Sequence, residues 1–248
     1  MSNNSDGKPE LIINGKRLDG RGVEDLRNLR IEAGVLKQAA GSAYVEWGKN
    51  KIICGVYGPR ECIPKFEASP YRALIKCRYM MAPFCSLEEH GRSGPSRRST
   101  ELSKVIREVF ENLIISESFP RTEIDIYMEI LQSDGGTRTA AITAACVALA
   151  NAGIPLKDMV SALALGKADG KMVVDLAKEE DNFGESDFPV AVSHRNKELL
   201  LIQMDGMLTK EEISDLIDLA IKKSEEIHKK QSEALIAVYD QKEGNFVL

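Results

Sequence analysis

The order of apolar and polar residues in the first half of the chain predicts several β-strands. Apolar positions roughly alternate with polar ones over residues 42–56, around Gly48-Lys49-Asn50, a pattern typical of a β-hairpin. Residues 71–81 predict a further strand. Residues 123–131 alternate strictly, and this predicted strand leads directly into a glycine turn.

A helix is predicted between two of these strands. Residues 100–116 place apolar side chains at helical spacing, with Ser99 or Thr100 as the expected N-cap. The preceding residues 90–99 combine Gly, Pro, Ser and Arg without periodicity, so we expect a loop. Arg97 and Arg98 would then lie at a junction between a loop and a helix.

The second half repeats this order of strands before a helix. The expected strands cover residues 162–167, 172–176, 188–192 and 198–204, with a turn at Ala168-Asp169-Gly170. Residues 214–239 carry apolar side chains at helical spacing with charges between them, which predicts a long final helix. Strands that precede helices in both halves predict an α+β fold.

The segment 130–153 is the most informative motif. An apolar run breaks at Asp134-Gly135-Gly136 and resumes as an Ala-rich helical pattern. Glycines that expose backbone N–H groups, followed by the first turn of a helix, favour a bound anion. Arg138 can add a bidentate guanidinium, and Thr137 and Thr139 can donate or cap. The alternative is an ordinary glycine turn with Arg138 in a salt bridge.

Composition limits the class of protein. With 248 residues and 43% hydrophobic content, the chain can bury a substantial core. We expect a polar leader over residues 1–10 and one domain over residues 11–248, with halves of about 11–155 and 156–248. No uninterrupted apolar stretch reaches membrane-spanning length, and the leader is too polar for a signal peptide, so a cytoplasmic protein is expected. The five cysteines form no CxxC pair, which disfavours a zinc site or a disulfide framework.

The charges are unevenly placed. The formal net charge is −5, yet residues 51–107 hold eleven Lys/Arg against five Asp/Glu, whereas residues 171–248 hold ten against seventeen. A basic stretch and an acidic stretch therefore coexist, which allows a polyanion to bind locally despite the overall charge. The alternative is two solvated faces.

Three clusters together meet the requirements of phosphoryl transfer. Arg97 and Arg98 resemble a clamp for an oligoanion, beside the anion site at Arg138. Asp181 and Asp187, in a predicted acidic loop, could hold Mg²⁺ or give a proton to a leaving oxygen, or could simply be solvated. An attacking phosphate, a neutralised scissile phosphate and a stabilised leaving oxygen are the parts this reaction needs.

The ordered motifs of the chain resemble the RNase PH family of phosphorolytic exoribonucleases, and within it the catalytic type of subunit in archaeal exosomes. The resemblance runs nearly end to end and is carried by Arg17-Leu18-Asp19-Gly20-Arg21, Gly41-Ser42-Ala43, Tyr57-Gly58-Pro59, Pro95-Ser96-Arg97-Arg98 with Glu101-Leu102, Phe119-Pro120-Arg121, Asp134-Gly135-Gly136-Thr137-Arg138, Gly166-Lys167-Ala168-Asp169-Gly170, and Asp175-Leu176 with Glu180-Asp181. It implies two βαβα-type halves with mixed sheets and the active site between them.

The resemblance also implies 3′-to-5′ RNA degradation with inorganic phosphate as co-substrate, which releases nucleoside diphosphates. Gly136, Thr137 and Arg138 would bind the attacking phosphate, in agreement with the anion site. Arg97 and Arg98 would grip the terminal RNA phosphates. Because one phosphoric ester linkage replaces another, the reverse reaction would add 3′ tails.

The same resemblance gives roles to further residues. Asp181 and Asp187 would handle a Mg²⁺ (or Mn²⁺) ion and the leaving-group proton, without an assignment of which does which. Lys65, Phe66 and Arg72 are candidates for contact with RNA, with Phe66 as a stacking face. The alternative for Phe66 is packing in the core.

Family members of this kind work in rings. The resemblance implies that this subunit alternates with a homologous inactive subunit in a hexamer, with RNA-binding cap subunits and single-stranded RNA 3′ ends as further partners. Two alternatives remain: a non-catalytic RNA-binding ring subunit, and a stand-alone RNase PH that trims tRNA 3′ ends.

Overall fold

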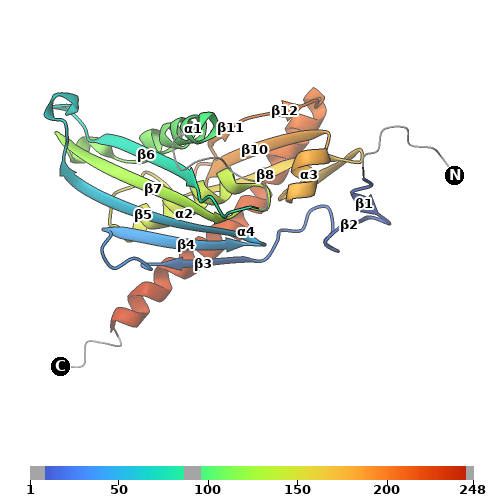
Figure 1. Ribbon diagram of the computed structural model, residues 1–248, viewed down its shortest axis with the longest axis horizontal. Helices are drawn as coiled ribbons and strands as arrows, with labels where there is room; N and C mark the ends of the chain where they lie inside the picture. The colour runs from blue at the N-terminus through green and yellow to red at the C-terminus, as the bar shows by residue number, and fades with distance from the viewer. Residues whose placement is uncertain (1–8, 87–95, 244–248) are drawn as a thin grey trace.

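The computed structural model describes residues 9–86 and 96–243 and confirms the expected α+β fold. Figure 1 shows two twisted sheets with helices between and beside them. The leader residues 1–8 and the loop residues 90–95 lie outside the described residues. None of the helices within the described ranges is long and apolar enough to cross a membrane.

The first sheet is built by the first half of the chain. Its strand order is β3-β4-β5-β7-β6, and only β6 and β7 run parallel to each other. A parallel neighbour requires a crossover connection, and α1 (Arg97–Leu113) supplies it. The strands are β3 (Leu29–Ala33), β4 (Gly41–Trp47), β5 (Asn50–Glu61), β6 (Leu74–Met81) and β7 (Thr122–Gln132).

The second sheet is built by the second half and is antiparallel. Its order is β11-β10-β8-β9, with β12 also paired to β10. A small N-terminal hairpin, β1 (Ile12–Ile13) and β2 (Lys16–Arg17), lies near this sheet at the right of Figure 1. The strands are β8 (Val160–Ala168), β9 (Lys171–Val174), β10 (Ser186–Ser193), β11 (Leu199–Ile202) and β12 (Asp205–Gly206).

Helix α2 (Thr137–Asn151) lies between the two sheets. It contacts β4 and β5 of the first sheet and β8 and β10 of the second. Nearly all its side chains are buried, which explains why the Ala-rich segment has no polar face. The N-terminus of α2 is therefore held rigidly at the point where both halves of the chain meet.

The predicted strands are present with shifted ends. The hairpin over residues 42–56 is β4 and β5, joined by Gly48-Lys49, although β5 continues to Glu61. The strand predicted over residues 71–81 begins only at Leu74. The segment predicted as one strand over residues 198–204 is β11, followed by the short β12.

Helix α1 begins earlier than predicted. Its N-cap is Ser96, so Ser99 and Thr100 are wrong as caps, and Arg97–Ser99 are helical rather than loop. Ser96 and Ser99 form a capping box in which the Ser96 hydroxyl accepts the Ser99 N–H at 3.0 Å. The helix ends at Leu113, before the predicted residue 116, because Ile114 is extended and pairs with Leu156.

The acidic segment, predicted as a loop, contains the short helix α3 (Lys178–Phe183). Glu179, Glu180 and Asp181 lie in its first turn, where negative charge interacts favourably with the helix N-terminus. Glu180 also accepts the backbone N–H of Ala177 at 2.8 Å. These interactions make a helix stable in a segment whose composition is typical of a solvated loop.

The final helix, α4 (Lys210–Glu243), is longer than the predicted 214–239. Thr209 and Glu212 bond reciprocally: the Glu212 carboxylate accepts the Thr209 N–H, and the Thr209 hydroxyl accepts the Glu212 N–H. This capping box places the start of the helix at Lys210, about one turn closer to the N-terminus than predicted. The helix packs against β3 and β8 and thereby joins the two sheets.

Candidate active site

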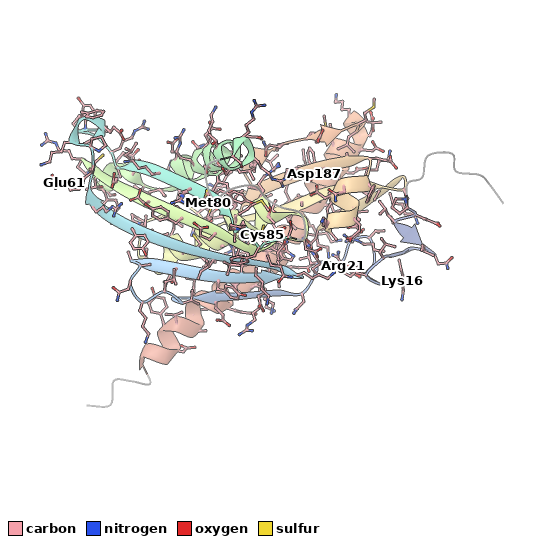
Figure 2. The ribbon with its side chains drawn as sticks, in the orientation of Figure 1. Lys16, Arg21, Glu61, Met80, Cys85 and Asp187 are labelled. Atoms are coloured by element: carbon pink, nitrogen blue, oxygen red, sulfur yellow. The ribbon has the colours of Figure 1, made fainter. Side chains whose placement is uncertain are left out.

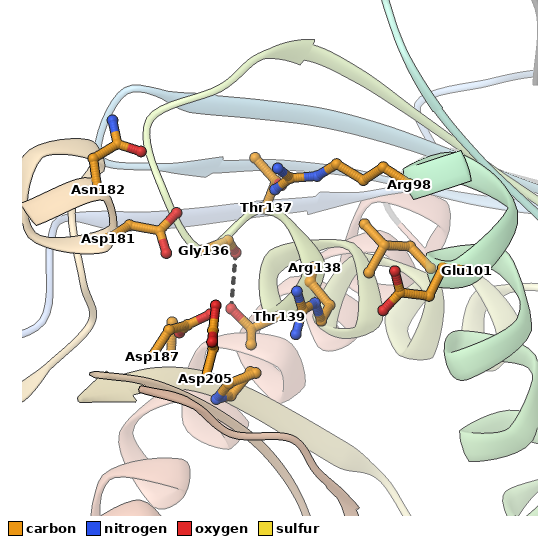
Figure 3. A pocket seen from close by; sticks show the side chains of 13 residues that line it. Arg98, Glu101, Gly136, Thr137, Arg138, Thr139, Asp181, Asn182, Asp187 and Asp205 are labelled. Carbon is orange, nitrogen blue, oxygen red and sulfur yellow. Dashed lines mark hydrogen bonds between the residues drawn. The ribbon is translucent and has the colours of Figure 1, made fainter. Parts of the chain in front are cut away.

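A pocket of about 370 Å³ lies where the N-terminus of α2 faces α3 and the second sheet (Figure 3). Its walls come from α1, α2, α3, β8, β10 and β12, so both halves of the chain contribute. Seven of the residues selected from the sequence line it: Arg98, Gly136, Thr137, Arg138, Thr139, Asp181 and Asp187.

The turn before α2 requires glycine. Gly135 and Gly136 have φ angles of +75° and +66°, and Gly136 is the N-cap of the helix. A Cβ on Gly135 would lie 2.6 Å from the carbonyl carbon of Ala177 and 2.8 Å from the amide nitrogen of Lys178. The missing side chain therefore lets this turn pack directly on the backbone that leads into α3.

The hydroxyls of the first turn of α2 have defined partners. The buried Tyr79 donates its hydroxyl to Thr137 Oγ1 at 2.8 Å. Because Thr137 accepts this bond, its own proton is available for donation to another group. Thr139 donates to the carbonyl of Gly136 at 2.8 Å, which holds the turn closed (Figure 3). Of these two threonines, only Thr139 holds the turn closed with its own hydroxyl, whereas Thr137 keeps its proton for donation.

Arg138 lies on the second-sheet side of the turn. One terminal nitrogen donates to Gln203 Oε1 at 2.6 Å, so its partner is a neutral amide. The Nε of Arg138 is buried and has no hydrogen-bond partner among the described residues. A buried N–H of a cation without an acceptor is costly, and an anion in the pocket would supply that acceptor.

The two predicted RNA-binding arginines of α1 point differently. Arg98 lines the pocket, as Figure 3 shows, and its charge partly offsets the rise in pKa that burial causes at Asp181 and Asp187. Arg97 is exposed and does not line the pocket. The structure therefore brings only Arg98 to the other predicted site residues.

Asp181 and Asp187 face the pocket from α3 and β10. Burial, together with the neighbouring charge of Asp181, raises the pKa of Asp187 to about 6. Removal from water likewise raises the pKa of Asp181, against the opposing effect of Arg98 and Arg138. Asp187 is half-buried, which argues against simple solvation of that carboxylate, whereas Asp181 is exposed at the mouth of the pocket and its role stays a prediction.

The sequence did not reveal several residues that line the pocket. Asp205 on β12 pairs in register with Asp187 on β10, so a third carboxylate joins the two predicted ones. The Asp205-Gly206 dipeptide after a predicted strand is a turn signal, but nothing local reveals its strand partner. The other pocket residues that were not predicted to lie at the site are Glu101, Leu102, Ala164, Asn182 and Pro189.

Lys65, Phe66 and Arg72 lie far from this pocket. They belong to the connection between β5 and β6, at the end of the molecule opposite the second sheet, where Figure 2 labels Glu61. Phe66 is 87% exposed, so the alternative of core packing is wrong. Lys65 forms an exposed ion pair with Glu61 at 2.8 Å. Their role in RNA contact stays a prediction.

The carboxylates of the pocket could supply some, but not all, of the ligands of a magnesium ion. Mg²⁺ binds through one or two carboxylates and takes its other ligands from water and substrate phosphates. Asp181 and Asp187 provide two carboxylates, and the charge of Asp181 raises the pKa of Asp187, a repulsion that a cation would relieve. Among the described residues, no group of three or more His, Cys, Asp or Glu side chains forms a ready-made metal cage.

Comparison with known proteins identifies the family. The sequence model of the 3′ exoribonuclease family (RNase PH), domain 1, matches residues 25–155, and the model of domain 2 matches residues 158–223. The chain belongs to the RNase PH family of 3′ exoribonucleases. The turn at Gly135-Gly136 and the carboxylates of Asp181 and Asp187 therefore lie in different family domains, and both line the same pocket.

Curated relatives within this family are similar over nearly the whole chain. The exosome complex component Rrp41 of Thermococcus kodakarensis is 53% identical over 96% of this chain and 99% of its own length. The Rrp41 component of Pyrococcus furiosus is 55% identical over 94% of both chains. Identity at this level implies the same fold.

Solved structures of the family agree with this fold. Rice Rrp46 aligns with a TM-score of 0.79 at 25% identity, over 88% of this chain and 99% of that one. A structure described as the Archaeoglobus fulgidus exosome with RNA bound to the active site aligns with a TM-score of 0.74 at 24% identity, over 88% and 93% of the two chains.

Proposed function

We propose that this chain is the catalytic subunit of an exosome core, a 3′-to-5′ exoribonuclease that uses inorganic phosphate. One observation carries the proposal: the anion-binding turn at Gly136 and Arg138 faces Asp181 and Asp187 across a single polar pocket. Family membership supplies the substrate class, RNA degraded from its 3′ end.

In this mechanism the phosphate binds at the N-terminus of α2. The backbone N–H groups of the first turn, the free proton of Thr137 and the unpaired Nε of Arg138 would hold its oxygens. One phosphate oxygen attacks the phosphorus of the last internucleotide bond. Arg98 stabilises the charge that develops on that phosphorus group.

The departing 3′ oxygen is stabilised by the carboxylates. With a pKa of about 6, Asp187 exchanges a proton near neutral pH, as proton transfer to a leaving oxygen requires. Asp181 and Asp187 are also the residues that would hold Mg²⁺ (or Mn²⁺), which would neutralise phosphate charge when bound. The products are a nucleoside diphosphate and an RNA shorter by one nucleotide.

The named relatives support a proposal about the assembly. Because several relatives are exosome components, we infer that this chain alternates with a homologous inactive subunit in a hexameric ring that receives single-stranded 3′ ends. RNA-binding cap subunits and a cytoplasmic location belong to the same proposal. An acidic chain can process RNA in such a ring because partner subunits share the channel surface.

The decisive experiment identifies the products. The chain is assembled with its RNase PH-type partner and incubated with 5′-labelled RNA, with and without phosphate. We expect shortening only with phosphate and release of nucleoside diphosphates. Equal release of nucleoside monophosphates in phosphate-free buffer would contradict the proposal.

The alternatives are tested in the same system. A non-catalytic ring subunit would show no shortening that depends on Arg138 and Asp181, and their convergence on one pocket argues against this role. A stand-alone tRNA-trimming enzyme would form a hexamer by itself. The mass of the chain alone and with its partner distinguishes these cases.

A further inference from the structure

Three arginines of the N-terminal segment, Arg17, Arg21 and Arg27, converge on the backbone of the active site without lining the pocket. Arg17 is 3% exposed and Arg27 is 7% exposed. Both meet at Asp175, which is 2% exposed and directly precedes the segment that leads into α3. Buried arginines in such number require a reason beyond packing, because each must find partners for several N–H groups.

Arg27 holds the turn that precedes α2. Its guanidinium pairs with the Asp175 carboxylate at 2.6 Å and also donates to the carbonyls of Asp134 at 2.5 Å and Gly135 at 3.3 Å. The Asn50 side chain donates to the same Gly135 carbonyl at 2.6 Å and accepts the Asp134 N–H at 2.5 Å. Two side chains therefore fix the two peptide units before the N-cap.

The hydrogen bonds to the Gly135 carbonyl also fix the direction of the Gly136 N–H. The Gly135 carbonyl and the Gly136 N–H belong to one planar trans peptide, so they point in opposite directions. While Arg27 and Asn50 keep the carbonyl on their side, the Gly136 N–H is turned away from them. Arg27 thus sets the orientation of a backbone donor at the anion-binding turn without contact with the anion.

Arg17 holds the helix that carries a carboxylate. Its Nε donates to Glu180 at 2.6 Å and its Nη2 donates to the second oxygen of the same carboxylate. The remaining donors reach the carbonyls of Val174 at 2.6 Å and Asp175 at 2.7 Å. Because successive helical residues are about 100° apart, Glu180 held inward by Arg17 directs the next residue, Asp181, to another side.

We propose that Arg27 and Arg17 are positioning residues with separate effects, Arg27 on binding of the attacking phosphate and Arg17 on Asp181, one of the two carboxylates that stabilise the leaving oxygen. The inference rests on the proposed function. Both arginines bond Asp175: its carboxylate accepts from Arg27 and from Trp47 Nε1, and its carbonyl accepts from Arg17. Through this one residue the N-terminal segment is connected both to the turn before α2 and to α3.

The test uses Arg27→Lys and Arg17→Lys in the chain assembled with its partner. Lysine keeps the charge but cannot bond a carboxylate and two carbonyls in the same planar geometry. We expect Arg27→Lys to raise the KM for phosphate by about tenfold with a smaller change in kcat, and Arg17→Lys to lower kcat by about tenfold with the KM for phosphate nearly unchanged. Arg30→Lys, at an exposed arginine paired with Glu32, is the matched control and should change neither.

A second variant and a binding measurement keep the test independent of folding defects. Asn50→Ala removes the other donor to the Gly135 carbonyl without unpairing a buried charge, and it should also raise the KM for phosphate. Inorganic phosphate should raise the Tm of the wild-type chain more than that of Arg27→Lys. Equal changes of both parameters in Arg17→Lys and Arg27→Lys, or loss of activity only in proportion to folded protein, would overturn the inference. If the wild type makes no phosphate-dependent product, the proposed function fails, while the Tm shift still tests Arg27.

Discussion

The pocket and the β5–β6 connection, residues 62–73, are two candidate sites of contact with RNA, and they differ in how firmly their side chains are held. The glycine turn of the pocket is held by a buried side chain, because Arg27 bonds the Asp134 carbonyl and the Asp175 carboxylate. The connection instead presents Phe66 and Tyr71, which are 87% and 81% exposed, and its Lys65 pairs with another exposed side chain, Glu61.

This difference indicates that the pocket serves catalysis, whereas the β5–β6 connection serves RNA binding. Preorganised groups in a shielded site are worth far more to a transition state than solvated ones. Exposed aromatic and basic side chains can stack on bases or meet phosphates at little cost, but water screens their charges. Changes in the pocket should therefore alter the reaction itself, whereas changes in the connection should alter only how tightly RNA is held.

The largest expected effect is that of Asp181→Ala. Removal of this carboxylate should lower phosphate-dependent RNA shortening in the assembled complex by about a hundredfold or more, the range typical of proton-transfer and charge-stabilising groups. Folding should remain intact, which circular dichroism checks. Glu179→Ala, in the same turn of α3 but outside the pocket lining, is the matched control. Unchanged rates for Asp181→Ala would remove this residue from the mechanism.

Arg138→Ala should act on phosphate more than on RNA. Loss of a charge-assisted hydrogen bond of about 1.5 to 3 kcal/mol should raise the KM for phosphate by roughly 10- to 100-fold. A phosphate titration at saturating RNA measures the change, with Arg195→Ala, an exposed arginine before β11, as the control. A normal phosphate dependence would contradict the anion site.

Asp187 should make stability depend on pH. Its pKa is raised from 3.8 to about 6, so the folded chain retains a proton that the unfolded chain has lost between these values. This stabilisation is complete below the lower value and is lost as pH rises through the higher one. Asp187→Asn should therefore be more stable than wild type above pH 6 by on the order of 2 kcal/mol.

Urea denaturation without metal ions, across this pH range, measures that difference. A stability difference that does not vary with pH would show that the Asp187 carboxyl is not perturbed. If Mg²⁺ binds as proposed, adding it should stabilise the wild type more than Asp187→Asn, which lacks the ionised carboxylate.

The smallest expected effect is that of Phe66→Ala in the β5–β6 connection. Loss of one stacking surface, about 1 kcal/mol, should weaken RNA binding about fivefold. The KM for phosphate should not change, because the side chain lies far from the pocket. Ile236→Ala, at an exposed position on α4, controls for loss of apolar surface. An altered phosphate KM would break the separation between the two regions.

Much of the local structure could be predicted from the sequence. Strict alternation predicted β7, and helical spacing predicted α1 and α4, because both patterns arise from a core on one side. The ends were less predictable, since they depend on side-chain caps such as Ser96. Helix α3 was missed because it depends on Glu180, whose partner Arg17 lies 163 residues away in the sequence.

The sequence by itself determined the type of groups at the site: a glycine turn before a helix, arginines near it and acidic residues later in the chain. Only the tertiary structure decided which of them meet. It placed Arg98, Arg138, Asp181 and Asp187 around one pocket, added Asp205, and left Arg97 and Phe66 outside. The physical reason is that short motifs depend on backbone geometry within a few residues, whereas the pocket depends on how two sheets pack against α2.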